Sequence, residues 1–119
     1  MIVQAYAPIL HVAQLESALD FYVGTLGCRE TFRVGTYAGL ELGPLRLHLA
    51  ARDEAAGEHR PIGGGSLYIF CDSVEALFEH LSSSGATVLR RPEDSHYGMR
   101  EMAVADPDGN MLVFGTEIS

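Results

Sequence analysis

The stretch SLYIFCDSVEALFEHLSSSGA, from Ser66 to Ala86, decides the fold because it predicts a strand followed directly by a helix. Its first six residues are rich in strand-forming aromatic and branched side chains. Asp72, with Glu75 three residues later, predicts the cap at which a helix begins. Gly85 marks the end of that helix. The buried stripe of the helix follows the helical spacing and consists of Val74, Leu77, Phe78 and Leu81.

The first half of the chain carries the same pattern. An extended segment, 7–12, precedes a stretch with apolar residues at helical spacing, and Gly27 stands where a left-handed C-terminal cap is expected. The apolar positions of this predicted helix are Leu15, Leu19, Tyr22 and Leu26. With one gap, the second half of the sequence therefore repeats the first.

Each predicted helix is followed by three predicted strands. Those of the first half are 28–34, 36–42 and 45–50, and those of the second half are 87–90, 99–105 and 111–115. We therefore predict an α+β fold made of two βαβββ modules within one domain, residues 1–119. Module one covers about 1–51, an exposed linker about 52–65, and module two about 66–119.

The segment MREMAVADPDGN, residues 99–110, predicts a strand that enters a hairpin. Gly109 supplies the positive φ angle that the turn needs, and Asp106 bonds back to the turn backbone, so we interpret this turn as structural. Strand alternation places Glu101 with Ala103 on one face of the sheet and Arg100 on the other.

Composition limits the classes of partner. The chain has 16 acidic and 8 basic residues and a formal net charge of −8, which argues against nucleic acid and favours a cationic small molecule. No apolar run approaches the length of a membrane span, and the N-terminal residues lack the pattern of a signal peptide. We therefore expect a cytoplasmic protein without a membrane partner, in which Cys28 and Cys71 are reduced packing residues.

Four stretches together resemble the vicinal oxygen chelate superfamily, which includes glyoxalase I, extradiol dioxygenases, fosfomycin-resistance transferases and bleomycin-resistance proteins. They are ESALDFYVGTLGCRE, YAGLELGPLRLHL, LYIFCDSVEALFEHLSSSGA and MREMAVADPDGNMLVF, and they cover nearly the whole chain. The resemblance implies that the sheets roll into a cup. It also implies a homodimer, in which halves of two chains share the cavity.

The same resemblance locates the positions where related proteins hold a divalent metal ion. These positions fall on Ala7, His48, Ser66 and Val113, so only His48 is a good ligand, and we expect neither a metal nor another cofactor. A displaced set of His11, His48 and Glu101 is the alternative. Against it, His11 lies four residues beyond Ala7, about 13 Å along the strand.

The candidate ligand-binding residues are those that the resemblance and strand alternation direct toward the cup: His11, Arg46, His48, Ser66, Tyr68, Phe70, Glu101 and Ala103. The alternative for His11 is a strand-end residue bonded to water or backbone, and Tyr68 and Phe70 could be plain core. Arg46 could pair with Glu101 or bind an anionic group. We assign Phe21 and Tyr22 to the core, and the histidines at 59, 80 and 96 to solvent.

Two functions follow from these residues. The first is a metal-independent protein of the bleomycin-resistance or glyoxalase-like type, which sequesters a small molecule without chemistry. The second is a glyoxalase-like lyase, isomerase or dioxygenase-related enzyme that uses the displaced metal, or Glu101 or His48 as a general base. The sequence shows no nucleophile with an adjacent base, which favours the first function and leaves catalysis open.

Overall fold

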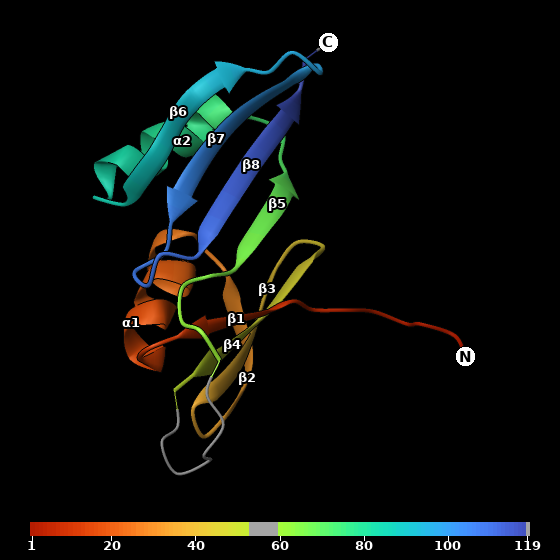
Figure 1. Ribbon diagram of the computed structural model, residues 1–119, viewed down its shortest axis with the longest axis vertical. Coiled ribbons are helices and arrows are strands. Elements are labelled where there is room, and N and C mark those ends of the chain that lie inside the picture. Colours follow the sequence, from red (N-terminus) through yellow and green to blue (C-terminus); the bar gives the residue numbers. More distant parts are fainter. Residues whose placement is uncertain (53–59, 119) are drawn as a thin grey trace.

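A computed structural model describes residues 1–52 and 60–118, and its elements are drawn in Figure 1. The first half consists of β1 (Ile9–Val12), α1 (Leu15–Leu19), η1 (Asp20–Thr25), β2 (Arg29–Val34), β3 (Tyr37–Leu42) and β4 (Leu45–Ala51). The second half consists of β5 (Ser66–Phe70), α2 (Val74–Ser83), β6 (Thr87–Asp94), β7 (Met99–Ala105) and β8 (Met111–Glu117).

The strands form two four-stranded sheets with the same topology. The first sheet has the order β1-β4-β3-β2 and the second the order β5-β8-β7-β6. In each sheet the strand before the helix pairs in parallel with the last strand of its module, whereas the other pairs are antiparallel. The predicted α+β fold of two βαβββ modules is therefore confirmed.

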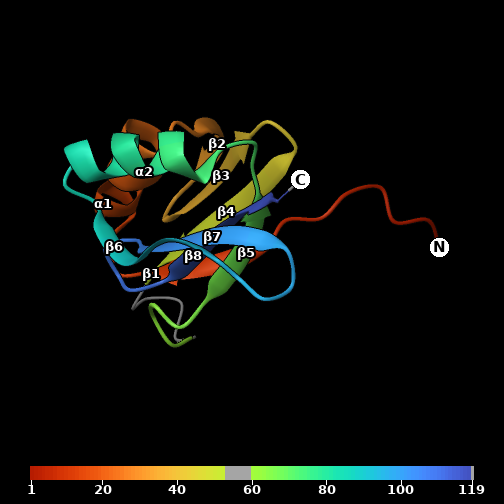
Figure 2. The same ribbon diagram turned by 90° about the horizontal axis from the view of Figure 1, so that it is seen from above.

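Each sheet packs one face against its own helix. In β4 the side chains of Leu47 and Leu49 are buried, and in β8 those of Leu112 and Phe114 are buried, whereas His48 and Val113 between them are partly exposed. Both helices lie on the same side of the molecule, as Figure 2 shows. We call the opposite side of each sheet its open face.

The first helix differs from the predicted continuous α-helix. Only five residues, Leu15–Leu19, are α-helical, and a π-helical segment, η1, continues the coil. The amide of Leu26 donates to the carbonyl of Phe21, five residues earlier, at 2.8 Å. In this wider turn the neighbouring side chains of Phe21 and Tyr22 are both buried and meet edge to face, with ring centroids 4.9 Å apart, so their assignment to the core is confirmed.

The cap of the second helix was predicted one residue too early. Ser73, not Asp72, is the cap, and its hydroxyl accepts the amide of Ala76 at 3.2 Å. Glu75 is the second residue after this cap rather than the third, so it completes no capping box, and its carboxylate pairs with Arg100 on β7. The glycines after the helices behave as predicted, since Gly27 and Gly85 have φ angles of +94° and +80°.

Several strand bounds also differ from the prediction. The strand expected at 87–90 continues to Asp94, because two register shifts let β6 keep its pairing with β7. β8 continues to Glu117 rather than 115, and β1 begins at Ile9 rather than at residue 7. Residues 53–59 of the predicted linker lie outside the described residues.

The turn that follows β7 has the predicted structural role. Gly109 has a φ angle of +94°, and one carboxylate oxygen of Asp106 accepts the amides of Asp108 and Asn110, each at 2.9 Å. The other oxygen accepts the hydroxyl of Tyr22, which belongs to η1 in module one, at 2.9 Å. The turn therefore joins the two modules as well as two strands.

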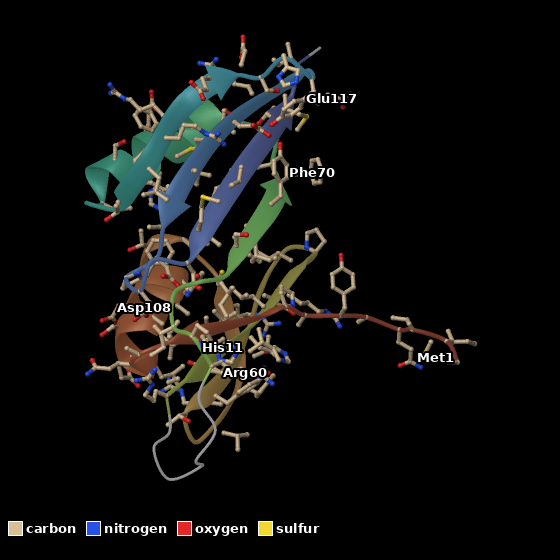
Figure 3. The ribbon with its side chains drawn as sticks, viewed as in Figure 1. Met1, His11, Arg60, Phe70, Asp108 and Glu117 are labelled. Atoms are coloured by element: carbon tan, nitrogen blue, oxygen red, sulfur yellow. The ribbon has the colours of Figure 1, made fainter. Side chains whose placement is uncertain are left out.

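Further bonds extend this junction to β1 and the segment before β5. The side-chain amide of Asn110 donates to the carbonyl of His11 at 3.2 Å, and its oxygen accepts the amide of Gly65 at 2.9 Å. The carboxylate of Asp108 accepts the amide of Ala13 at 3.1 Å. Figure 3 labels Asp108 and His11 on the two sides of this junction. These bonds fix how the two sheets sit side by side.

Candidate functional site

A buried carboxylate occupies the centre of the open face of the second sheet. Glu101 on β7 is 4% exposed, and its oxygens accept the hydroxyls of Tyr68 at 2.6 Å and Tyr97 at 2.5 Å. The guanidinium of Arg90 lies 3.8 Å away. We call these four residues the Glu101 cluster. The hydrogen bonds from Tyr68 and Tyr97, with a smaller effect of Arg90, hold the pKa of Glu101 below its usual value, so the carboxylate is ionised at neutral pH.

The two tyrosines of the cluster are held in their neutral form. Desolvation, together with the hydrogen bond to Glu101, raises the pKa of Tyr68 to about 12. The hydrogen bond to Glu101 is also the main cause that raises the pKa of Tyr97. Both phenols are therefore neutral at neutral pH and donate hydrogen bonds to Glu101. A carboxylate with a lowered pKa is also a weak general base, which argues against that role for Glu101.

The open face of the first sheet carries a different group. The hydroxyl of Tyr37 lies 2.8 Å from Nδ1 of His48, and the ring of Phe32 packs against both, with centroids 6.2 Å from Tyr37 and 5.2 Å from His48. We call Phe32, Tyr37 and His48 the His48 cluster. This cluster offers aromatic surface and one imidazole. Among the described residues, no carboxylate is bonded to that imidazole.

One glycine in each sheet makes room for these rings. A methyl group at Gly115 would overlap the hydroxyl of Tyr68, and one at Gly39 would overlap the ring of Phe32. Both glycines lie on the open face, beneath an aromatic side chain of a neighbouring element. In both sheets a glycine thus lets an aromatic side chain approach the strand closely.

Strand alternation places the predicted site residues on the open faces in two groups. Tyr68 and Glu101 are in contact, Ala103 follows on the same face of β7, and Ser66 and Phe70 share the face of Tyr68 on β5. Arg46 and His48 alternate with buried residues on β4, and His11 pairs with Ala50 beside them. Whether these residues bind a ligand stays a prediction.

Two expectations about pairing have clear outcomes. Arg100 forms ion pairs with Glu75 and Asp94 and does not point to the open face. The predicted orientation of β7, with Glu101 and Arg100 on opposite faces, is therefore confirmed. The cation that approaches Glu101 is Arg90 of its own module, so the suggested pair with Arg46 is wrong. The expectation missed Arg90 because a register shift in β6 brings it opposite Ala103, and no sequence signal marks that shift.

Sequence reasoning also missed Tyr97, Tyr37 and Phe32. Tyr97 lies in the loop before β7, four residues from Glu101, where alternation gives no information. Tyr37 could have been found, since it shares the strand face of Gly39 in a strand whose other face is buried. Phe32 was hidden by a register shift between Glu30 and Phe32.

The residues at the superfamily's metal positions do not fit a divalent ion. Ala7 and Val113 offer no lone pair, and serine is a poor ligand. Across residues 1–52 and 60–118, no three histidine, cysteine or acidic side chains gather closely enough to hold a metal ion. The alternative set of His11, His48 and Glu101 is likewise not brought together, because Glu101 belongs to the other sheet.

Comparison with known proteins now identifies the class. A model of the glyoxalase/bleomycin resistance protein/dioxygenase superfamily matches residues 4–114, which is most of the chain. The chain belongs to that superfamily. No protein of curated function matches it.

Several solved structures share the fold. TioX from Micromonospora sp. ML1 superposes with a TM-score of 0.79 at 20% identity and covers 97% of this chain and 100% of its own. A glyoxalase/bleomycin resistance protein/dioxygenase from Nocardioides gives 0.78 at 19% identity, over 100% of this chain and 87% of its own. A glyoxalase/bleomycin resistance protein from Catenulispora acidiphila gives 0.74 at 23% identity, over 96% and 98%. At these identities the likeness shows the fold alone.

Proposed function

We propose that this protein is a metal-independent small-molecule-binding protein of the bleomycin-resistance or glyoxalase-like type. In this proposal it holds its ligand on the open faces of the sheets, in a cavity that two copies share. Ligand capture, rather than turnover, is its activity. Both cysteines are free thiols, which agrees with the cytoplasmic location that we also propose.

The observation that carries the proposal is the aromatic surface left exposed on the open faces. Phe70 is 78% exposed, Tyr97 59%, Tyr68 41% and Phe32 40%. Figure 3 shows Phe70 projecting from the end of β5. Complete burial of a fully exposed large apolar side chain gains about 1.5–3 kcal/mol, and covering a half-exposed one gains a corresponding part, so these side chains together favour an occupant. A flat ligand and a second copy of the chain would together cover this surface.

An enzyme is the second candidate, and one observation favours it. Tyr37 engages Nδ1 of His48, which fixes the ring and leaves Nε2 as the nitrogen that can exchange a proton with a substrate. His48→Gln would then abolish turnover and leave binding in place. A protein that only sequesters its ligand shows no turnover before or after this substitution.

A thermal-shift screen of small molecules, run with and without divalent cations, tests the binding proposal. We expect ligands that raise the melting temperature by mass action, and no change on adding a chelator. Phe70→Ala should weaken the shift, whereas Val23→Ala, which removes an exposed apolar side chain on η1 in module one, should not. Stoichiometric metal in the purified protein, together with chelator-dependent stability, would overturn metal independence.

The shared cavity requires a dimer. Sedimentation at micromolar concentration should give about twice the chain mass of 12.9 kDa. A stable monomer that still binds ligands would remove the shared cavity from the proposal and retain the binding function.

A further inference from the structure

A groove of about 350 Å³ lies where the two modules meet. Its walls come from the N-terminal segment, the turn between β3 and β4, and the strand β5. The side chains that matter for its chemistry are Tyr6, Pro8, Leu45, Arg46, Tyr68 and Ile69. A volume of this size suits a ligand of one or two rings.

Arg46 is the single charged side chain among the described residues that line this groove. In the described parts of the chain its guanidinium has no acidic partner, although acidic residues outnumber arginines in the sequence. Its cross-strand neighbour Glu41 pairs with Arg29 instead. Arg46 therefore presents an uncompensated positive charge at the groove.

The rest of the groove is apolar or aromatic, and it is tied to the sheets at Pro8 and Tyr68, whereas Tyr6 is 85% exposed. The amide of His48 donates to the carbonyl of Pro8 at 2.9 Å, which holds the N-terminal segment beside β4 next to Arg46. The hydroxyl of Tyr68 is bonded to Glu101, which holds its ring in place where it lines the groove. A cation between apolar walls is suited to a ligand with one charged end and one flat apolar end.

The local charges point to the sign of the ligand. The total charge of −8 favours a cation at long range, but salt screens that effect beyond about 8–10 Å. At contact distance the carboxylate of Glu101 already accepts two hydroxyls and faces Arg90, whereas Arg46 has no acidic partner within residues 1–52 and 60–118. A guanidinium binds a carboxylate through two parallel hydrogen bonds.

We infer that the groove binds a small aromatic carboxylate, with its carboxylate on Arg46 and its ring between Tyr68 and Tyr6. This inference rests on the proposed binding function and specifies the ligand class of that function. The composition of the chain favours a cationic ligand, whereas this inference assigns an anionic one.

Three probes with the same naphthalene ring test the inference on the full chain: the isosteric pair 2-naphthoate and 2-naphthamide, and the cationic 2-naphthylmethylammonium. Titrations followed by amide chemical shifts give both affinity and location. We expect naphthoate to bind about ten-fold or more tightly than naphthamide, with the largest shifts at Leu45, Tyr68 and Ile69. Raising the salt concentration should weaken naphthoate binding and leave naphthamide binding unchanged.

Two arginine variants supply the matched comparison. Arg46→Gln should lower the naphthoate affinity about ten-fold or more and remove the preference over naphthamide. Arg91→Gln should change neither, because Arg91 lies over the ring of Phe78 and does not line the groove. Arg46 is exposed, so its substitution should leave the fold intact, which the amide spectrum of the variant checks directly.

The outcomes separate this inference from the function beneath it. Equal binding of naphthoate and naphthamide, or naphthoate binding that survives Arg46→Gln, overturns the anionic ligand class. Preferential binding of the ammonium probe near Tyr97 and Glu101 overturns it too, while the binding function stands. If none of the three probes binds but the thermal-shift screen yields other ligands, only this inference fails.

Discussion

Asp106 and Glu101 are two carboxylates with equal burial and opposite surroundings. Each is 4% exposed, and each accepts a hydrogen bond from a tyrosine. The donors to Asp106 are the fully buried Tyr22, the fully buried Asn110 and two backbone amides. The donors to Glu101 are Tyr68 and Tyr97, which are 41% and 59% exposed.

This difference separates a structural carboxylate from an adaptable one. Tyr22 and Asn110 are fully buried, so the bonds that these two side chains make to Asp106 are fixed by folding and hold the two modules together. The partners of Glu101 stand at the surface, where a ligand or a second chain can touch them without disturbing the core. The burial of a polar group thus says less about its role than the exposure of the groups that bond to it.

The largest expected effect comes from deleting one tyrosine hydroxyl at each carboxylate. Tyr22→Phe should lower the free energy of unfolding by about 1–3 kcal/mol, since it leaves a buried oxygen of Asp106 short of a donor. Tyr97→Phe should lower it by less than about 1 kcal/mol, because water can replace the lost hydroxyl at the surface. Urea unfolding of both variants measures the difference. Equal losses would remove the distinction between the two sites.

The module pattern was readable from the sequence because it depends on periodicity. Apolar residues at helical spacing and glycines after the helices predicted both modules, and alternation along β7 predicted the faces of Glu101 and Arg100 correctly. These features are local. Each depends on residues within one element and on one burial requirement.

Features set by contacts between elements could not be read in this way. The π-helical segment η1 has apolar residues at the spacing of an α-helix. It differs from an α-helix only in the carbonyl to which each backbone amide donates. Register shifts in β2 and β6 decide that Phe32 joins the His48 cluster and that Arg90 reaches Glu101. The bonds from Asn110 to His11 and Gly65 link distant segments, so the turn was predicted without its role between the modules.

A pH series gives an intermediate effect and reports on Glu101 itself. Hydrogen bonds from Tyr68 and Tyr97 lower the pKa of Glu101 in the folded state below the ordinary value of 4.5. Its ionised form therefore stabilises the fold above that value, and this stabilisation is lost as the pH falls through the lower folded pKa. Other carboxylates also titrate in this range, so the informative quantity is a difference between two proteins.

Glu101→Gln supplies that difference because it removes the titration and keeps the shape. Unfolding free energies of the original protein and the variant should differ by a constant amount between about pH 5 and pH 7. The difference should shrink as the pH is lowered toward about 3. A difference that does not change with pH would mean that the hydrogen bonds from the two tyrosines do not favour the ionised carboxylate.

The smallest expected effect concerns Arg90, which approaches Glu101 at 3.8 Å while its own side chain is 44% exposed. Solvent screens such a pair, so Arg90→Gln should change the free energy of unfolding by less than about 1 kcal/mol. The same substitution should raise the pKa of Glu101 less than Tyr68→Phe or Tyr97→Phe does, because hydrogen bonds from the two hydroxyls lower that pKa more than the charge does. Carbon-detected NMR titration of the Glu101 carboxyl gives the pKa in each variant. If Arg90→Gln raises the pKa of Glu101 the most, the charge of Arg90, and not the hydrogen bonds from the two tyrosines, keeps this buried carboxylate ionised.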